Sequence, residues 1–168
     1  MSATTLDKTR TSLAEAMRLV AMSVSIISAG DNKGRHYAMT ATSAISVSLN
    51  PESMLVCINK NTLFSSILGA ADRFAVNLLS TAQVALSKDC AGGLPQDSRV
   101  NERDWEIHAD GLALVKGAQA SILCRKTRLY EHGTHNLLIG DVYDIVVHKN
   151  NDTLLYMDGK YGKFKEIK

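Results

Sequence analysis

Residues 37–49 have the sequence YAMTATSAISVSL, in which apolar and polar side chains alternate. Because side chains in a β-strand point to opposite faces with a period of two, this alternation predicts one extended strand with two different faces. We expect the apolar face to lie against the core. The other face is a row of small hydroxyls, which either meets water or leaves room for a flat ligand close to the backbone. The apolar face holds Met39, Ala41, Ile45, Val47 and Leu49, and the other face holds Thr40, Thr42, Ala44, Ser46 and Ser48.

The length and composition of the chain predict one soluble globular domain. Its 168 residues are 45% hydrophobic and 21% charged, which is typical of such proteins. We therefore treat residues 1–168 as a single domain, with residues 1–11 as a loosely ordered start of an N-terminal helix. The net charge of +2, without an arginine-rich tract, indicates no nucleic-acid partner. The apolar runs are shorter than the roughly 20 residues of a membrane span, and the N-terminus has no signal core, so we expect no membrane partner and a cytoplasmic location.

The cysteines and histidines do not predict a metal site. Cys57, Cys90 and Cys124 form no CxxC pair, and we expect them to be buried thiols. His132 and His135 are three residues apart, but a predicted turn separates them and no acidic residue lies between them. The sequence also contains no GxGxxG, GxxxxGK[ST], HExxH or GxSxG motif, so the usual nucleotide, metalloprotease and hydrolase patterns are excluded.

The remaining sequence predicts more strands than helices, and short turns join most of the strands. Because strand and helix do not alternate regularly, a parallel sheet is not indicated. We expect a mainly β fold, an antiparallel barrel with a few flanking helices. Further strands are predicted over residues 23–29, 54–59, 73–79, 118–130, 135–148 and 154–157, helices over residues 6–22, 63–70 and 80–90, a loop over residues 94–103 and a connector over residues 111–117.

Several polar breaks interrupt this apolar framework, and two of them are predicted helix starts. Asn61 or Thr62 is a candidate N-cap, and residues 80–83 match a capping box that begins with Ser80. Helix N-termini offer free amides that suit a phosphate. Taken with the hydroxyl row, the breaks fit a site for a phosphate and a flat polar ring, although caps and turns explain each break equally well. The breaks lie at residues 59–62, 77–80 and 133–135.

Five segments, in this order, resemble the short-chain flavin reductase family. More closely, they are similar to the reductase components of two-component flavin monooxygenases of the 4-hydroxyphenylacetate type. The likeness covers about residues 12–164, and an ordered set of segments is more specific than any one motif. The segments are MSVSIISAG at 22–30, TATSAISVSLNPESMLVCINKNT at 40–62, FAVNLLSTAQVALS at 74–87, GTHNLLIGDV at 133–142 and LLYMDGKYGKF at 154–164.

The resemblance implies a fold, an activity and partners. The fold is an antiparallel, Greek-key split β-barrel of the FMN-binding kind, usually a homodimer. The activity is that of an NAD(P)H:flavin oxidoreductase, in which NADH or NADPH gives a hydride to FMN or FAD and the reduced flavin passes to a separate oxygenase component. Two alternatives share the barrel: a flavin-binding module without pyridine-nucleotide activity, and a flavoenzyme of the pyridoxamine-phosphate oxidase type.

The resemblance also implies roles for particular residues. His135 matches a family histidine beside the nicotinamide and is the candidate catalytic residue, which would orient that ring; the alternative is a turn residue whose ring is satisfied within the protein. Many relatives have Gly-Asp-His where this chain has Gly133-Thr134-His135, and an aromatic residue or histidine near Met157, so the carboxylate partner of His135 and the nicotinamide contacts stay open. Two flavin contacts have alternatives, since Asn77 is equally well a buried structural amide and Lys60 a solvated loop charge. The implied contacts are Thr40, Ala41, Thr42, Ser43, Ser46, Val47 and Ser48 along the flavin ring, Asn59, Lys60, Asn61 and Thr62 at the ribityl chain and phosphate, Asn77, Leu78 and Ser80 completing the pocket, and Tyr161 in a closing C-terminal segment.

Overall fold

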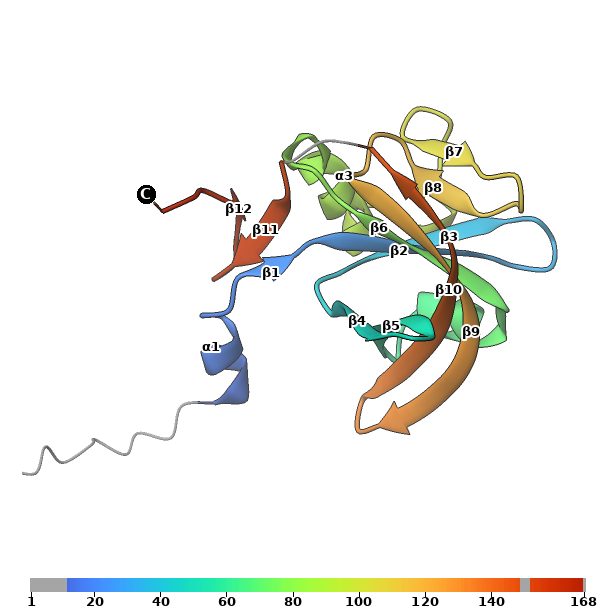
Figure 1. The fold of residues 1–168 in the computed structure, drawn as a ribbon, viewed down its shortest axis with the longest axis horizontal. Helices are drawn as coiled ribbons and strands as arrows, with labels where there is room; N and C mark the ends of the chain where they lie inside the picture. The colour runs from blue at the N-terminus through green and yellow to red at the C-terminus, as the bar shows by residue number, and fades with distance from the viewer. Residues whose placement is uncertain (1–11, 149–151, 168) are drawn as a thin grey trace, which may run out of the picture.

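The main body is one antiparallel sheet of seven strands, shown in Figure 1. The computed structural model describes residues 12–148 and 152–167. Neighbouring strands of the sheet follow the order β3–β2–β6–β9–β10–β5–β4, and every pair is antiparallel. The mainly β, antiparallel fold is therefore confirmed. The strands are β2 (Ser25–Gly30), β3 (His36–Ala41), β4 (Ala44–Leu49), β5 (Glu52–Asn59), β6 (Arg73–Leu78), β9 (Ala120–His132) and β10 (His135–Val147).

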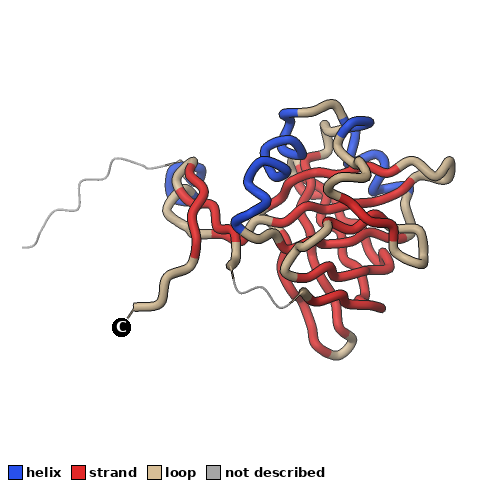
Figure 2. Tube along the Cα trace, turned by 90° about the horizontal axis from the view of Figure 1, so that it is seen from above, coloured by secondary structure: helices blue, strands red, loops and turns tan. Residues whose placement is uncertain are grey.

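The two edge strands of this sheet are consecutive in the sequence. Only Thr42 and Ser43 separate the end of β3 from the start of β4. Since consecutive Cα atoms are about 3.8 Å apart, this link spans at most about 11 Å. The opposite edges of the sheet must therefore approach one another, and the sheet curls around its interior, as Figures 1 and 2 show. The covalent link at this point brings the edges of the split barrel together.

The prediction of one strand over residues 37–49 is wrong. The chain leaves the β3 edge after Ala41 and joins the β4 edge at Ala44. The period of two is also lost within β4, because the register with β5 shifts between Ser46 and Ser48 and leaves Val47 as an extra residue. The expected core face therefore holds for the first half only: Ala41 is buried, whereas Ile45, Val47 and Leu49 are 54%, 53% and 84% exposed.

The core lies on both faces of the sheet, and β2 contributes to each. Ile27 packs with Val56 and Phe74 in the interior cluster, whereas the next residue back, Ile26, packs with Trp105 in the outer cluster. This alternation follows from the period of two in a strand that is covered on both sides.

Short helices and a small hairpin cover these two clusters. Helix α2 (Leu63–Ala70) starts at its N-cap Thr62, as predicted, and buries Phe64 and Leu68 in the interior cluster. The capping box at Ser80 is confirmed, since Gln83 Oε1 accepts from Ser80 N–H at 2.8 Å. The predicted connector over residues 111–117 contains a strand instead. The elements of this region are η1 (Thr81–Gln83), α3 (Val84–Lys88), η2 (Asp89–Gly93), η3 (Gln96–Ser98), β7 (Trp105–Ile107) and β8 (Ala113–Val115).

The N-terminal and C-terminal segments together form an arm that projects from the body (Figures 1 and 2). We call α1 (Leu13–Met17), β1 (Met22–Ser23), β11 (Leu154–Met157) and β12 (Lys160–Lys163) the arm. Its three strands pair in the order β1–β11–β12, and an ion pair of 2.9 Å joins Arg18 to Asp158. Strand β12 was not predicted.

Part of the N-terminal prediction falls in the arm. The helix predicted over residues 6–22 ends at Met17 in the structure, and its first residues, like the predicted loose start over residues 1–11, lie outside the described residues. None of the helices in the described ranges is long and apolar enough to cross a membrane.

Candidate functional site

The link between β3 and β4 forms a wall of small side chains. The hydroxyl of Ser43 donates to the carbonyl of Cys57 at 2.9 Å, and the amide of Cys57 donates back to the carbonyl of Ser43 at 3.3 Å. These bonds fix the link against β5. The half-buried residues Thr42, Ser43 and Ala44 carry no bulky side chain. A flat molecule can therefore approach the backbone here closely.

Two residues beyond Cys57, β5 ends in a turn that builds an anion-accepting helix start. The amide of Asn61 donates to Asn59 Oδ1 at 2.9 Å, and the Thr62 hydroxyl donates to the Asn59 carbonyl at 2.9 Å. Thr62 Oγ1 also accepts from the Ser65 amide, at 3.1 Å. Within the described ranges no hydrogen bond is made by the amides of residues 63 and 64. These amides, at the positive end of the helix dipole, suit an anionic group.

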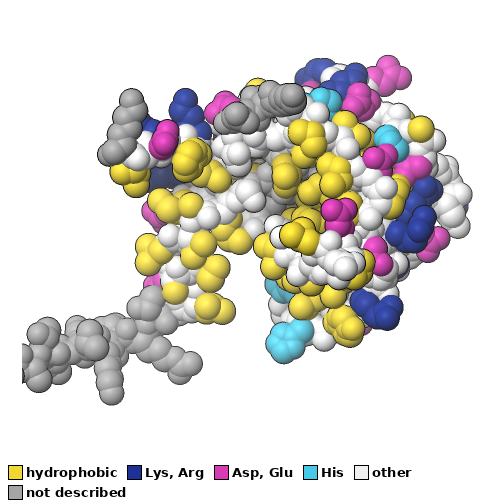
Figure 3. Space-filling model, in the orientation of Figure 1, with side chains coloured by type: hydrophobic (Ala, Val, Ile, Leu, Met, Phe, Trp, Pro, Cys, Tyr) yellow, Lys and Arg dark blue, Asp and Glu magenta, His cyan; other side chains and the backbone are white. Residues whose placement is uncertain are grey.

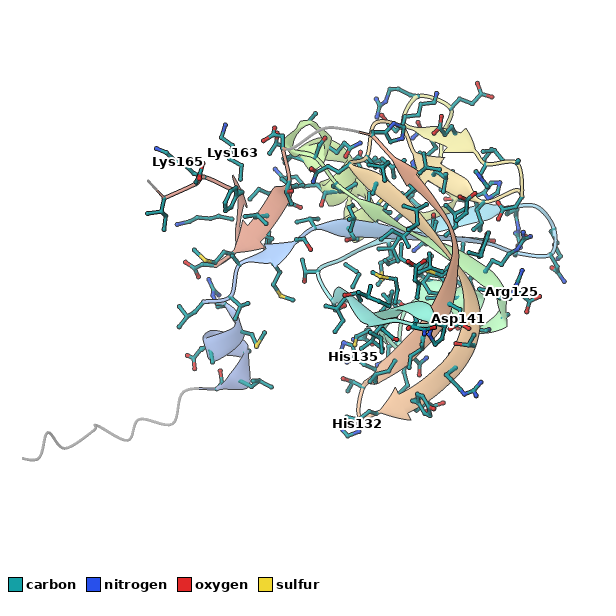
Figure 4. All side chains as sticks on the ribbon, viewed as in Figure 1. Arg125, His132, His135, Asp141, Lys163 and Lys165 are labelled. Carbon is teal, nitrogen blue, oxygen red and sulfur yellow. The ribbon has the colours of Figure 1, made fainter. Side chains whose placement is uncertain are left out.

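The tip of the β9–β10 hairpin lies against this turn. His135 pairs with Asn59 across the sheet, and the Lys60 amide donates to the Thr134 carbonyl at 3.0 Å. Figure 4 shows His132 and His135 close together at the tip. The ring of His135 is exposed, and its Nδ1 lies 2.9 Å from the Thr134 hydroxyl. In the described part of the chain its hydrogen-bonding neighbour is thus a hydroxyl.

A second group of predicted residues joins the arm to the body. The Thr40 hydroxyl donates to the carbonyl of Ser87 at 2.7 Å, so it is used to hold α3 against β3. The hydroxyls of Ser87 and Tyr161 lie 3.0 Å apart, and the ring of Tyr161 is edge-on to Tyr156 at 5.2 Å. Tyr161 thus ties the C-terminal strand β12 to α3. Ser87 was missed by the sequence reasoning; its only signal is a serine on the buried face of a short helix.

Of the two alternatives for Asn77, the contacts of its side chain favour the structural amide over the flavin contact. It is fully buried, and its side-chain nitrogen donates to the Ile26 carbonyl at 3.0 Å and to the Ser28 hydroxyl at 3.2 Å. Its side-chain oxygen accepts from the Val115 amide at 3.1 Å and the Ser121 hydroxyl at 2.7 Å. The side chain is therefore fully used in joining β2, β8 and β9 and has nothing left for a ligand.

Two other predicted pocket residues also point into the protein. Ser80 is 2% exposed, and both its amide and its hydroxyl are directed at Gln83 Oε1. Leu78 is half-buried and packs against the interior cluster. The structure therefore brings together the residues of the β3–β4 link, the turn after β5 and the hairpin tip. Leu78 lies one strand away from the link, since Ser25 of β2 pairs with both Leu78 and Ala41.

A cavity of about 620 Å³ lies at the other end of β3. It is bounded by the β2–β3 turn, the end of α2 and the turn before β8. About 17 Å of strand β3 separates it from the β3–β4 link. Two of its three carboxylates have partners, since Asp31 pairs with Arg35 at 2.7 Å and Asp110 with Arg73 at 3.3 Å, and the third, Asp72, is exposed.

The carboxylate of Asp110, at the edge of this cavity, accepts several hydrogen bonds that change its pKa. Its partial burial works to raise its pKa, but hydrogen bonds from the Tyr143 hydroxyl, the Leu112 amide and His108 outweigh this effect and lower the pKa. Over the residues that the structure describes, no group of three or more His, Cys, Asp and Glu side chains is placed to hold a metal ion.

The donor set at the β5 end fits a flat, phosphorylated ligand. The small-residue wall suits a ring, and the free amides with the ammonium of Lys60 suit a phosphate. A curled antiparallel sheet with such a wall beside a helix start therefore defines a candidate site for a flavin nucleotide.

Comparison with known proteins identifies the family. Residues 17–165 match the model of the "Flavin reductase like domain" family. The chain is 34% identical to the reductase component of an FADH2-dependent resorcinol hydroxylase from Rhizobium sp., over 86% of this chain and 82% of the relative. It is 30% identical to the 4-hydroxyphenylacetate 3-monooxygenase reductase component of Pseudomonas aeruginosa, over 89% of each chain. A solved NADH:FAD oxidoreductase of Streptomyces globisporus, in complex with NAD and FAD fragments, superposes with a TM-score of 0.82 at 27% identity, covering 91% of each chain.

The chain therefore belongs to the flavin reductase family, and the resemblance drawn from the five segments is confirmed.

Proposed function

We propose that the protein is an NAD(P)H:flavin oxidoreductase that reduces FMN or FAD by hydride transfer and supplies the reduced flavin to a partner monooxygenase. One observation carries this proposal: in a chain of this family, the small-residue link and the anion-accepting turn meet at one end of β5. The names of the relatives support the same activity, since they include reductase components of monooxygenases and an enzyme solved with NAD and FAD fragments.

The chain's own residues bind and orient rather than react. The flavin, when bound, supplies the hydride-accepting ring. Small residues from Ala41 to Ala44, with Ser46, Val47 and Ser48 on β4, let a flat ring lie near the backbone, where amide donors stabilise developing negative charge. The turn at residues 59–62 and the start of α2 hold the phosphate. No side chain needs to act as an acid or base, because a hydride moves between two cofactors.

His135 is proposed to orient the nicotinamide. Its exposed ring stands at the hairpin tip, and the contact with the Thr134 hydroxyl fixes the orientation of that ring. His135→Ala should therefore raise the Michaelis constant for NADH or lower turnover at saturating flavin, and unchanged values of both would remove this role. Thr134→Val keeps the shape and removes the hydroxyl, so it separates the effect of ring orientation from that of the histidine itself.

We further propose a homodimer. The exposed apolar side chains of β4, with those of Leu19 and Val20 near α1, are more apolar surface than a scattered pattern explains. Figure 3 shows apolar side chains on the arm and on the facing side of the body, with a notch between them. A second copy of the chain that fills this notch would cover both surfaces.

We also propose that the protein works in the cytoplasm, because its proposed hydride donor is NADH or NADPH. Fractionation of the source cells would test this location.

One anaerobic assay tests the activity. The protein is mixed with NADH or NADPH and an excess of FMN or FAD, and the flavin absorbance is followed. Bleaching of many equivalents per protein supports the reductase. Tight flavin binding without turnover would replace it by a flavin-binding module, and reduction that needs an amine would replace it by an oxidase of the pyridoxamine-phosphate type.

A further inference from the structure

Lys60, the cation of the proposed phosphate site, already has an anionic partner. Its Nζ lies 3.1 Å from Oε2 of Glu131 on β9, and the two side chains are 33% and 67% exposed. The Lys60 backbone is held independently, because its amide donates to the Thr134 carbonyl at 3.0 Å. The pairing of Asn59 with His135 keeps the turn and the hairpin in register. Only the side chain of Lys60 is therefore free to change partners.

We propose that Glu131 competes with the flavin phosphate for Lys60 and so weakens the binding of phosphate-bearing flavins. This inference rests on the proposed function. A carboxylate and a phosphate are both oxyanions, and a lysine ammonium on a flexible stem can serve either. An exposed ion pair is weak, whereas a phosphate monoester carries about −1.5 to −2 charges at neutral pH. Binding of the flavin thus exchanges one partner of Lys60 for another.

The exchange has a direct consequence for a reductase that hands its product to another enzyme. Breaking the pair with Glu131 costs free energy, which offsets part of the attraction between Lys60 and the phosphate. The flavin is therefore bound less tightly and dissociates faster. When the flavin leaves, Glu131 takes Lys60 back and neutralises the vacated ammonium. A flavin without a phosphate does not take part in the exchange and is insensitive to Glu131.

The test compares FMN with riboflavin, which lacks the phosphate, by fluorescence titration in low salt. Glu131→Gln keeps the size of the side chain and removes its charge. It should bind FMN on the order of two- to fivefold more tightly than the wild type, with riboflavin affinity unchanged. In the Lys60→Met background Glu131→Gln should give no gain, and in high salt the gain should disappear. Glu106→Gln is the matched control, because Glu106 is an exposed residue of β7 with no ion pair among the described residues.

The outcomes separate the inference from the proposed function. If Glu131→Gln binds FMN no more tightly than the wild type while NADH still bleaches excess flavin, the inference is overturned and the reductase stands. A gain that is equal for riboflavin also overturns it, because Glu131 would then act through folding. A gain that persists in the Lys60→Met background overturns it as well, because Glu131 would then repel the phosphate directly rather than compete for Lys60. A wild-type protein that binds neither flavin overturns both proposals.

Discussion

Strands β3 and β4 are neighbours in sequence with similar alternating patterns, yet they lie at opposite edges of the sheet and in different surroundings. Beside β3, residues of β2 such as Ile27 are fully buried. Helix α3 packs over β3, to which it is joined by the hydrogen bond from the Thr40 hydroxyl to the Ser87 carbonyl. Along β4, Ile45 is mostly exposed although it has the same side chain as Ile27. An alternating pattern thus identifies the two faces of a strand, but it does not tell what covers each face.

The largest expected difference is in stability, between Ile27 of β2, which lies beside β3, and Ile45 of β4. Ile27→Ala removes atoms from a closely packed interior and should lower the free energy of unfolding by about 2–5 kcal/mol. Ile45→Ala removes the same atoms from an exposed strand and should change it by no more than about 0.5 kcal/mol. Urea denaturation of both variants, at a protein concentration that keeps the chain monomeric, measures the difference. Equal losses at the two positions would show that β4 is covered within one chain.

A second substitution tests how tightly the buried side is packed. Gly140 of β10 faces the ring of Phe74, and a Cβ atom at this position would lie 2.6 Å from that ring. Gly140→Ala should therefore destabilise the protein by about 1–3 kcal/mol through overpacking. Phe74→Leu in the same background makes room and should recover part of the loss. Gly162→Ala, where an added Cβ meets no atom within 4 Å, is the control in thermal unfolding.

The exposed apolar side chains of β4 predict an effect on the formation of the proposed homodimer. If a second copy covers β4, the double variant Ile45→Asp with Leu49→Asp should shift the protein from dimer to monomer in analytical ultracentrifugation. Its monomer should stay folded by circular dichroism, because both side chains are exposed within one chain. A wild-type protein that sediments as a monomer at all concentrations would contradict the proposed dimer.

The smallest expected effect concerns the turn that leads into β3. Slight desolvation works to raise the pKa of Asp31, but hydrogen bonds from the amides of Arg35 and Lys33 and from the Arg35 guanidinium lower it to about 2. A carboxylate with a lowered pKa stabilises the fold above its unfolded pKa of about 3.9 and loses this effect as the pH falls through its folded pKa. The melting temperature of Asp31→Asn should therefore fall less steeply than that of the wild type between about pH 4 and pH 2.

The control for this acid effect is Asp72→Asn, because Asp72 is exposed and forms no ion pair among the residues described. Its melting temperature should follow that of the wild type over the same range. If both variants flatten the pH dependence equally, the effect comes from net charge and not from the turn before β3.

Local signals predicted the parts of the fold that local contacts create. Thr62 caps α2, Ser80 and Gln83 form their capping box, and the β9–β10 hairpin turns where Gly133 supplies a positive φ of 53°. Each of these depends on bonds between residues a few positions apart, which the sequence displays directly. The short strand β12 lacked such a signal, since it is stabilised by pairing with β11 and by the contact of Tyr161 with α3.

The candidate site was predictable in part, and its errors share one cause. The turn at residues 59–62 was found, because polar residues that interrupt an apolar run stand out in the sequence. The break between β3 and β4 at Thr42 and Ser43 was missed, because the alternation of side chains continues through it. Asn77 stands out in the same way, but its partners come from β2, β8 and β9 and are far away in the chain. Glu131 gave no signal at all, because its partner Lys60 is 71 residues away.

The sequence by itself determined most of the strands, several of their turns, the helix caps and, through its ordered segments, the flavin reductase family. The tertiary structure alone decided which faces are covered, because burial depends on what packs against a strand and not on the strand's own pattern. It also decided which polar groups are already paired. The side chains of Asn77 and Thr40 are bonded within the fold, whereas the amides of residues 63 and 64 make no hydrogen bond within the described ranges.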